Sequence, residues 1–70
     1  MFEEYEFILP DGTSRFEMVD LSSPFGAQVF AFRRMHRAVA VWPVRMGERF
    51  AWHRRRLARR LASGPAASGL

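Results

Sequence analysis

The stretch "MFEEYEFILPDGTSRFEMVD", residues 1–20, decides the fold because it is typical of two β-strands joined by a tight turn. Apolar and polar residues alternate over residues 2–9 and 14–20, which is the period of a strand with one buried face. Between them, Pro10 presets a turn φ, Asp11 bonds to nearby backbone, and Gly12 allows a positive φ. The pattern therefore predicts an antiparallel hairpin.

The apolar pattern also predicts the register of this hairpin. Tyr5, Phe7 and Leu9 share one face of the first strand. Phe16 and Met18 share one face of the second, and the two faces coincide if Phe7 lies opposite Phe16 across a four-residue loop. A slip of one residue would place Phe7 opposite an arginine instead. We therefore expect one apolar inner face and an outer, mostly acidic face made of Glu4, Glu6, Arg15 and Glu17.

A helix and a third strand are expected after the hairpin. Ser23 followed by Pro24 is typical of a helix N-cap and first turn. An apolar stripe at helical spacing then predicts a helix over 24–36, but "AQVFAF" also suits a strand, and this alternative stays open. The stripe places His36 partly in the core; its members are Phe25, Val29, Phe32 and His36. "AVAVWPV", residues 38–44, predicts a buried strand with Pro43 at an edge or end.

The segment "RFAWHRRRLARRLA", residues 49–62, predicts an amphipathic helix with a narrow apolar stripe and a broad basic arc. Arg54 is the exception, because it falls between the leucines and the alanines. We expect one core made of Phe7, Phe16, Val29, Phe32, Val41, Phe50, Leu57 and Leu61. The candidate partner-binding residues on the arc are Arg49, Trp52, His53, Arg55, Arg56, Arg59 and Arg60.

These elements predict a small single α+β domain of order β-β-α-β-α, with an antiparallel hairpin sheet and two helices packed on it. The domain is expected over residues 1–62, and residues 63–70 are expected to form a flexible C-terminal tail. The chain has 70 residues and no cysteine, so disulfides cannot supplement a small core. We therefore expect a homodimer.

The distribution of charge and hydrophobicity indicates where the chain works. The acidic start "MFEEYEF" does not resemble a signal peptide, and the longest uncharged run, residues 21–32, is shorter than the about 20 apolar residues of a transmembrane helix. We expect a cytoplasmic protein with no transmembrane segment. The net charge is −5 over residues 1–31 and +9 over residues 32–70.

All eleven basic residues are arginine, and two explanations for this stay open. The planar guanidinium suits phosphate and carboxylate recognition, whereas GC-rich coding would favour arginine throughout the chain. Trp52 within the basic arc also has two interpretations. Either it is an exposed anchor for a partner, or it folds back over the sheet beside Trp42. A further possibility is that Glu3, Glu4, Glu6 and Glu17 neutralise part of the arc.

The sequence argues against an enzyme. It has no cysteine nucleophile, glycine-rich phosphate loop or metalloprotease motif. His36 and His53 lie 17 residues apart on different elements, which is not a metal-ligand spacing. We expect no catalytic residue, no metal site and no cofactor.

The function expected from these observations is non-enzymatic binding, with the C-terminal helix docked on an anionic partner. That partner is an acidic protein surface or a nucleoprotein complex. Small domains of this kind are typical of inhibitors encoded by phages and other mobile elements, so inhibition of host machinery, such as a nucleic-acid-guided defence complex, is the expected role. The alternatives are an autonomous nucleic-acid-binding regulator and, last, a membrane-surface protein.

Overall fold

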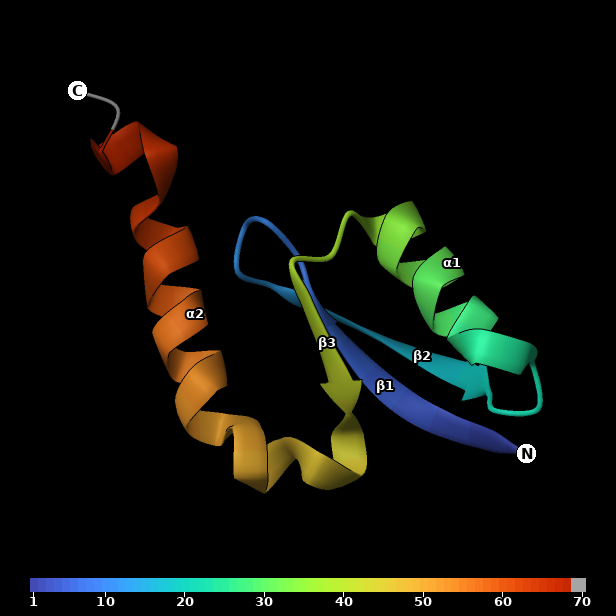
Figure 1. The fold of residues 1–70 in the computed structure, drawn as a ribbon. Helices are drawn as coiled ribbons and strands as arrows, with labels where there is room; N and C mark the ends of the chain where they lie inside the picture. The colour runs from blue at the N-terminus through green and yellow to red at the C-terminus, as the bar shows by residue number, and fades with distance from the viewer. Residues whose placement is uncertain (69–70) are drawn as a thin grey trace.

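Three antiparallel strands form one sheet with a helix on each side of it in the computed structural model, which describes residues 1–68 (Figure 1). The α+β class and the predicted order of the elements are confirmed, and residues 27–36 form a helix rather than a strand. The strand order is β2-β1-β3, so β2 and β3 are both edges. The elements are β1 (Phe2–Ile8), β2 (Ser14–Asp20), η1 (Pro24–Gly26), α1 (Ala27–His36), β3 (Ala40–Pro43), η2 (Val44–Met46) and α2 (Gly47–Ser68).

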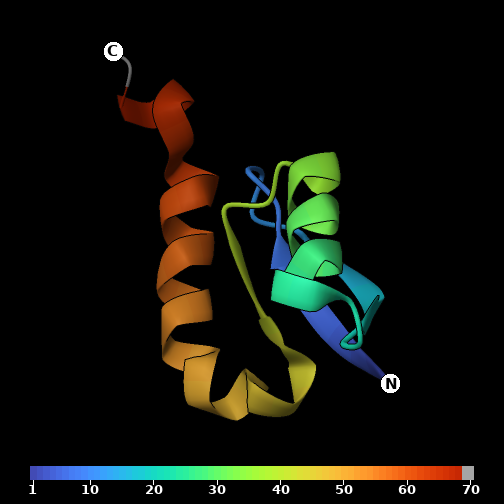
Figure 2. The ribbon, with the colours of Figure 1, turned by 45° about the vertical axis from the view of Figure 1, so that its right-hand side comes forward.

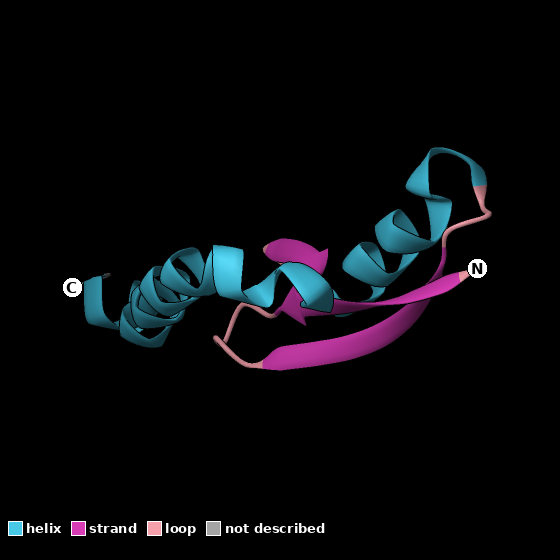
Figure 3. Cartoon of the chain, turned by 90° about the horizontal axis from the view of Figure 1, so that it is seen from below, coloured by secondary structure: helices cyan, strands magenta, loops and turns pink. Residues whose placement is uncertain are grey.

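The last helix is longer than the sequence pattern predicts. It continues to Ser68 and so passes residue 62, where the sequence predicts the domain to end. It also reaches beyond the sheet (Figure 3), in a molecule whose principal extents are 45 × 25 × 16 Å. Residues 69–70 lie outside the described residues, and the flexibility expected for residues 63–70 stays a prediction.

The predicted register of the hairpin is wrong by one residue. Phe7 pairs with Arg15, and Glu6 pairs with Phe16. The Leu9 N–H donates to the Thr13 carbonyl at 2.8 Å, and the Gly12 N–H donates to the Leu9 carbonyl at 2.9 Å. Gly12 has a φ of +88°. This is the hydrogen-bond pattern of a three-residue hairpin loop that ends in a positive-φ glycine, so the loop is one residue shorter than expected.

The prediction failed because it assumed that only one face of the sheet is buried. In fact α1 covers one face and α2 covers part of the other (Figure 2). Neighbouring residues of β1 therefore both enter the interior, with Phe7 facing α1 and Ile8 facing α2, and both are buried. The expected acidic outer face is also wrong, because Glu6 is buried beneath α2 and Glu17 faces α1.

The core under α1 consists of Phe7, Val19 and Ala38, surrounded by partly buried apolar residues. The His36 ring stacks on Phe32 with centroids 6.2 Å apart, and its Nε2 donates to Glu17 Oε2 at 2.6 Å. The prediction of a partly buried histidine is confirmed. The partly buried residues around this core are Tyr5, Val29, Phe32 and Val41.

Phe16, expected in the core, is exposed, and so is Phe25, the first member of the predicted helical stripe. Phe16 is 53% exposed, because the shifted register places it on the face that α2 leaves open over β2. Phe25 is 95% exposed, because residues 25 and 26 adopt positive φ and separate η1 from α1. Ser23 is the N-cap of η1 and Pro24 follows at its first position, as predicted, but the Ser23 side chain makes no cap hydrogen bond. The N-cap of α1 itself is Gly26.

Candidate functional site

A buried carboxylate determines how α2 lies against the sheet. Glu6, on β1, is only 3% exposed. Its Oε1 accepts from Trp42 Nε1 at 2.9 Å, and its Oε2 accepts from Ser14 Oγ at 2.7 Å and from Arg54 Nη1 at 3.4 Å. Burying a carboxylate is costly unless its oxygens are hydrogen-bonded and its charge is paired. Glu6 therefore joins all three strands to α2.

Arg54 connects α2 to this buried carboxylate. Its position in the pattern, between the leucines and the alanines, places it on the side that faces the sheet, where it pairs with Glu6. The half-buried Phe50 and Leu57 flank it on the same side of the helix, since residues three and four apart are neighbours on a helix surface. The basic arc consequently runs around the outside of the helix, from Arg55 on one flank to Arg56 and Arg60 on the other.

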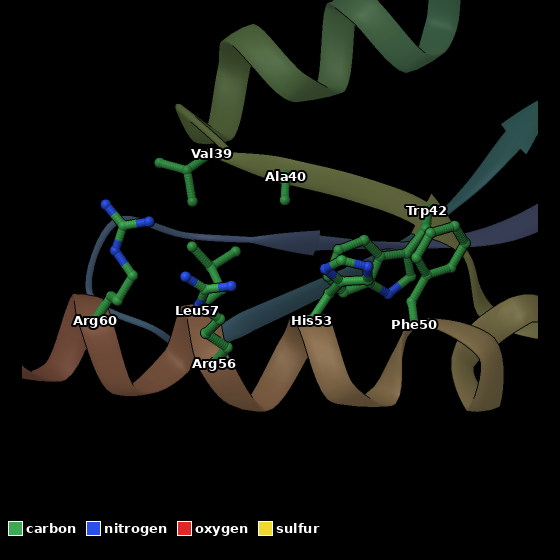
Figure 4. Close-up of a pocket in the computed structure, with 8 residues that line it drawn as sticks. All are labelled: Val39, Ala40, Trp42, Phe50, His53, Arg56, Leu57 and Arg60. Carbon is green, nitrogen blue, oxygen red and sulfur yellow. The ribbon is translucent and has the colours of Figure 1, made fainter.

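A cleft of about 480 Å³ separates α2 from the edge strand β3 (Figure 4). One end holds the rings of Trp42 and Phe50, which stack with centroids 5.3 Å apart and an interplanar angle of 8°. The guanidinium groups of Arg56 and Arg60 extend from α2 toward β3 at the other side of the cleft (Figure 4). The full lining is Val39, Ala40, Trp42, Phe50, His53, Arg56, Leu57 and Arg60.

Trp52 lies outside this cleft and is 55% exposed. The guanidinium carbon of Arg56 lies 5.3 Å from the centroid of its ring, which is the geometry of a cation–π contact. The His53 ring meets it edge-on at 5.0 Å. The structure therefore excludes the interpretation in which Trp52 folds back beside Trp42: Trp52 is exposed, and Phe50 packs there in its place.

No arginine of the basic arc takes part in an ion pair among residues 1–63. Arg45 pairs with Glu3, Arg54 pairs with Glu6, and His36 bonds to Glu17. Neutralisation by the acidic half thus reaches Arg45 and Arg54, neither of which was among the candidate site residues. Within residues 1–63, whose side chains are described, all five arginines of the arc are exposed and none lies within 4.0 Å of an acidic oxygen.

The structure divides the candidate residues among three places. His53, Arg56 and Arg60 line the cleft beside β3, and Trp52 adjoins them through Arg56. Arg55 lies on the other flank of α2, in a hollow of about 340 Å³ beside the hairpin loop. Arg49 and Arg59 are exposed on the helix. The predicted single arc is therefore two basic flanks joined across the outside of one helix.

The apolar wall of the cleft was not among the predicted site residues. The sequence pattern predicts a buried strand for Val39 and Trp42 and a core stripe for Phe50, and neither pattern by itself indicates a binding role. One signal was available: Pro43 indicates an edge strand, and an edge beside an amphipathic helix leaves an apolar groove uncovered.

The described residues contain no group of three or more side chains able to hold a metal ion. Among the helices in that part of the chain, none is both long and apolar enough to cross a bilayer. Comparison of the chain with protein-family models, with curated proteins and with solved structures finds no match.

Proposed function

We propose that this domain is a non-enzymatic binding protein that docks the outer face of α2 on an acidic surface of a partner protein or nucleoprotein complex. One observation carries the proposal. Glu3 and Glu6 of the acidic half are already paired with Arg45 and Arg54, while the five arginines of the arc, exposed around Trp52, have no acidic partner among residues 1–63. Arginine and tryptophan are the residues most enriched in the energetic centres of protein interfaces.

The cleft beside β3 supports a protein partner. A phosphate backbone needs positive charge alone, whereas this cleft combines stacked aromatic rings with guanidinium groups. That combination fits a side chain with an apolar body that is followed by a carboxylate. Trp52 and the cleft would then anchor the complex, and the outer arginines would accelerate association.

We propose inhibition of host machinery, such as a nucleic-acid-guided defence complex, as the role of this docking. A domain that presents a docking surface and has no catalytic motif in its sequence acts by occupying a surface of its partner. A basic helix that covers an acidic groove would exclude whatever normally binds there.

The test compares an acidic peptide that contains one aromatic residue with a 20-base-pair duplex, each fluorescently labelled and titrated by anisotropy at several salt concentrations. We expect the peptide to bind, and Arg56→Gln/Arg60→Gln to weaken its binding by about tenfold or more. The matched control is Arg34→Gln/Arg37→Gln, which removes the same charge from exposed positions at the end of α1. Equal losses from both double variants would indicate a non-specific effect of net charge and contradict the proposal.

The duplex measurement tests the alternative function, autonomous nucleic-acid binding. Each phosphate contact contributes about −0.9 to the slope of log K against log salt, so four or five engaged arginines predict a slope near −4. Tight duplex binding with such a slope, unchanged by Trp52→Ala, would replace our proposal with this alternative.

A further inference from the structure

The strand β2 is an open edge whose hydrogen-bonding groups are known residue by residue. The pairs Leu9–Thr13 and Met1–Leu21 are hydrogen-bonded across the hairpin at 2.8 Å each. Bonded and non-bonded pairs alternate in an antiparallel ladder, so the odd-numbered residues of β2 bond to β1. The even-numbered residues, from Ser14 to Asp20, therefore point their backbone N–H and C=O groups outward.

One end of this edge is already closed. The Asp20 N–H, which points outward, donates to Gln28 Oε1 of α1 at 2.8 Å. The Gln28 side chain thus takes the hydrogen bond that a neighbouring strand would otherwise make at Asp20. The outward groups of Ser14, Phe16 and Met18 have no such bond among the described residues.

The side chains along the same edge are apolar on one face and charged on the other. Phe16 is 53% and Met18 is 55% exposed, on the face that α2 leaves uncovered. Arg15 and Glu17 alternate with them on the face that carries α1. Unpaired edge groups beside exposed apolar side chains form a template for another strand.

We propose that a second copy of this chain binds along β2, antiparallel and two-fold symmetric, with Phe16 opposite Phe16 of the other copy. In this register Ser14 pairs with Met18, and all six outward groups of each copy find partners. Arg15 lies opposite Glu17 on the other face, twice, as a non-hydrogen-bonded pair in which side chains approach closely. The two sheets become one of six strands.

The complementarity of charge and hydrogen bonds selects this register over its neighbours. A shift by one pair toward the end of β2 would place Glu17 opposite Glu17, and like charges in this position repel each other. The shifted strand would also need a hydrogen bond from the Asp20 N–H, which already donates to Gln28. A shift toward the hairpin loop would place Arg15 opposite Arg15 and leave Met18 unpaired. Odd shifts would put the apolar side chains on opposite faces.

This inference does not rest on the proposed function, because β2 and β3 lie at opposite edges of the sheet. Pairing along β2 uses backbone groups at the edge of the sheet, so the outer side of both α2 helices stays uncovered. The dimer would therefore present two basic helices to a partner.

Two charge-swapped variants test the pairing. Arg15→Glu and Glu17→Arg each place like charges opposite one another in a homodimer, whereas a mixture of the two restores both opposite-charge pairs. Light scattering is expected to give twice 8.1 kDa for the natural chain, about 8.1 kDa for each variant, and twice 8.1 kDa for the mixture. Circular dichroism checks that each variant folds, since Glu17 also bonds to His36.

Cysteine cross-linking tests the register and does not depend on Glu17. The chain has no cysteine, and in the proposed dimer the two Phe16 Cα atoms are about 5.5 Å apart. The two Met18 residues are offset from each other by four residues along the strands, so their Cα atoms are about 13 Å apart. Phe16→Cys is therefore expected to cross-link on mild oxidation and Met18→Cys, the matched control, is not.

Three results would overturn the inference. The first is a mass of 8.1 kDa for the natural chain across the concentration range. The second is a mixture of the charge-swapped variants that stays monomeric although both variants fold. The third is equal cross-linking by the two cysteine variants. Cross-linking between Phe16→Cys and Met18→Cys chains, in preference to either alone, would contradict this register.

Discussion

At the scale of single residues, the buried Glu6 carboxylate links the three strands of the sheet to α2. It lies under α2 with three donors around it, and one of these donors, Arg54, comes from the helix itself. A polar residue in an alternating strand is normally assigned to the solvent face. Glu6 departs from that rule because two of its partners, Trp42 and Arg54, come from a strand and a helix that are distant in sequence.

Arg54→Ala is expected to destabilise the domain by about 1–3 kcal/mol, because it leaves the buried Glu6 carboxylate without its cationic partner. The range stays below that of a fully buried pair, since the Arg54 side chain is itself partly exposed. Urea denaturation followed by circular dichroism measures the change. Arg55→Ala, at the next position, is the control, and a change as small as its expected about 0.5 kcal/mol would show that Arg54 does not support Glu6.

Asp11 should make the hairpin loop sensitive to acid. The Thr13 hydroxyl and backbone N–H donate to Asp11 Oδ1 at 2.6 and 2.9 Å, and these bonds hold the pKa of the carboxyl below its ordinary value of 3.8. Because the folded-state pKa is the lower one, the stabilisation is present above pH 3.8 and is lost as the pH falls through the folded-state pKa. The stability difference between the natural chain and Asp11→Ala should therefore shrink below that pH in urea titrations, and a constant difference would contradict this.

At the scale of elements, α2 is held by few residues for its length. Its apolar stripe meets the sheet mainly where Phe50 stacks on Trp42, and the Gly12 turn approaches the helix near Ala58 and Leu61. An added Cβ at Gly12 would lie 3.6 Å from the Ala58 carbonyl oxygen. The hairpin loop therefore packs directly against the middle of α2.

Phe50→Ala is expected to cost about 2–3 kcal/mol, somewhat less than the about 3–5 kcal/mol of a fully buried phenylalanine, because Phe50 is only half-buried. The loss should fall on the docking of α2 to the sheet. Phe30→Ala, on an exposed position of α1, is the matched control. Equal free energies of unfolding for the two variants would show that the Trp42–Phe50 stack does not hold α2.

At the scale of the whole molecule, the two proposed binding surfaces lie on different parts of the domain. The basic helix covers part of one face of the sheet beside β3, and the open edge of β2 lies at the other side of the sheet (Figure 1). A domain of this size buries only about 60% of the surface of its unfolded chain. Joining two copies would extend the buried surface without covering α2.

The thermal midpoint is accordingly expected to rise with protein concentration, because mass action favours a folded dimer. Calorimetry between about 5 and 500 µM measures this rise, which Arg15→Glu should abolish. A midpoint independent of concentration in the natural chain would indicate a monomer.

The sequence alone was sufficient for the α+β class, the order of the elements and the arginine-rich helix. These features depend on local patterns: strand alternation, the Pro10–Gly12 turn and the helical spacing after residue 46. The half-buried His36 was also predictable, because its stripe partners Val29 and Phe32 lie on the same helix.

Only the tertiary structure decided the hairpin register, the burial of Glu6, the exposure of Phe16 and the division of the basic arc. Each depends on which helix covers which face of the sheet, and alternation along one strand cannot report that both faces are covered. Arg54 illustrates the reason. Its place in the pattern marked it as exceptional, but its role appeared only when a carboxylate 48 positions earlier in the chain was brought beneath it.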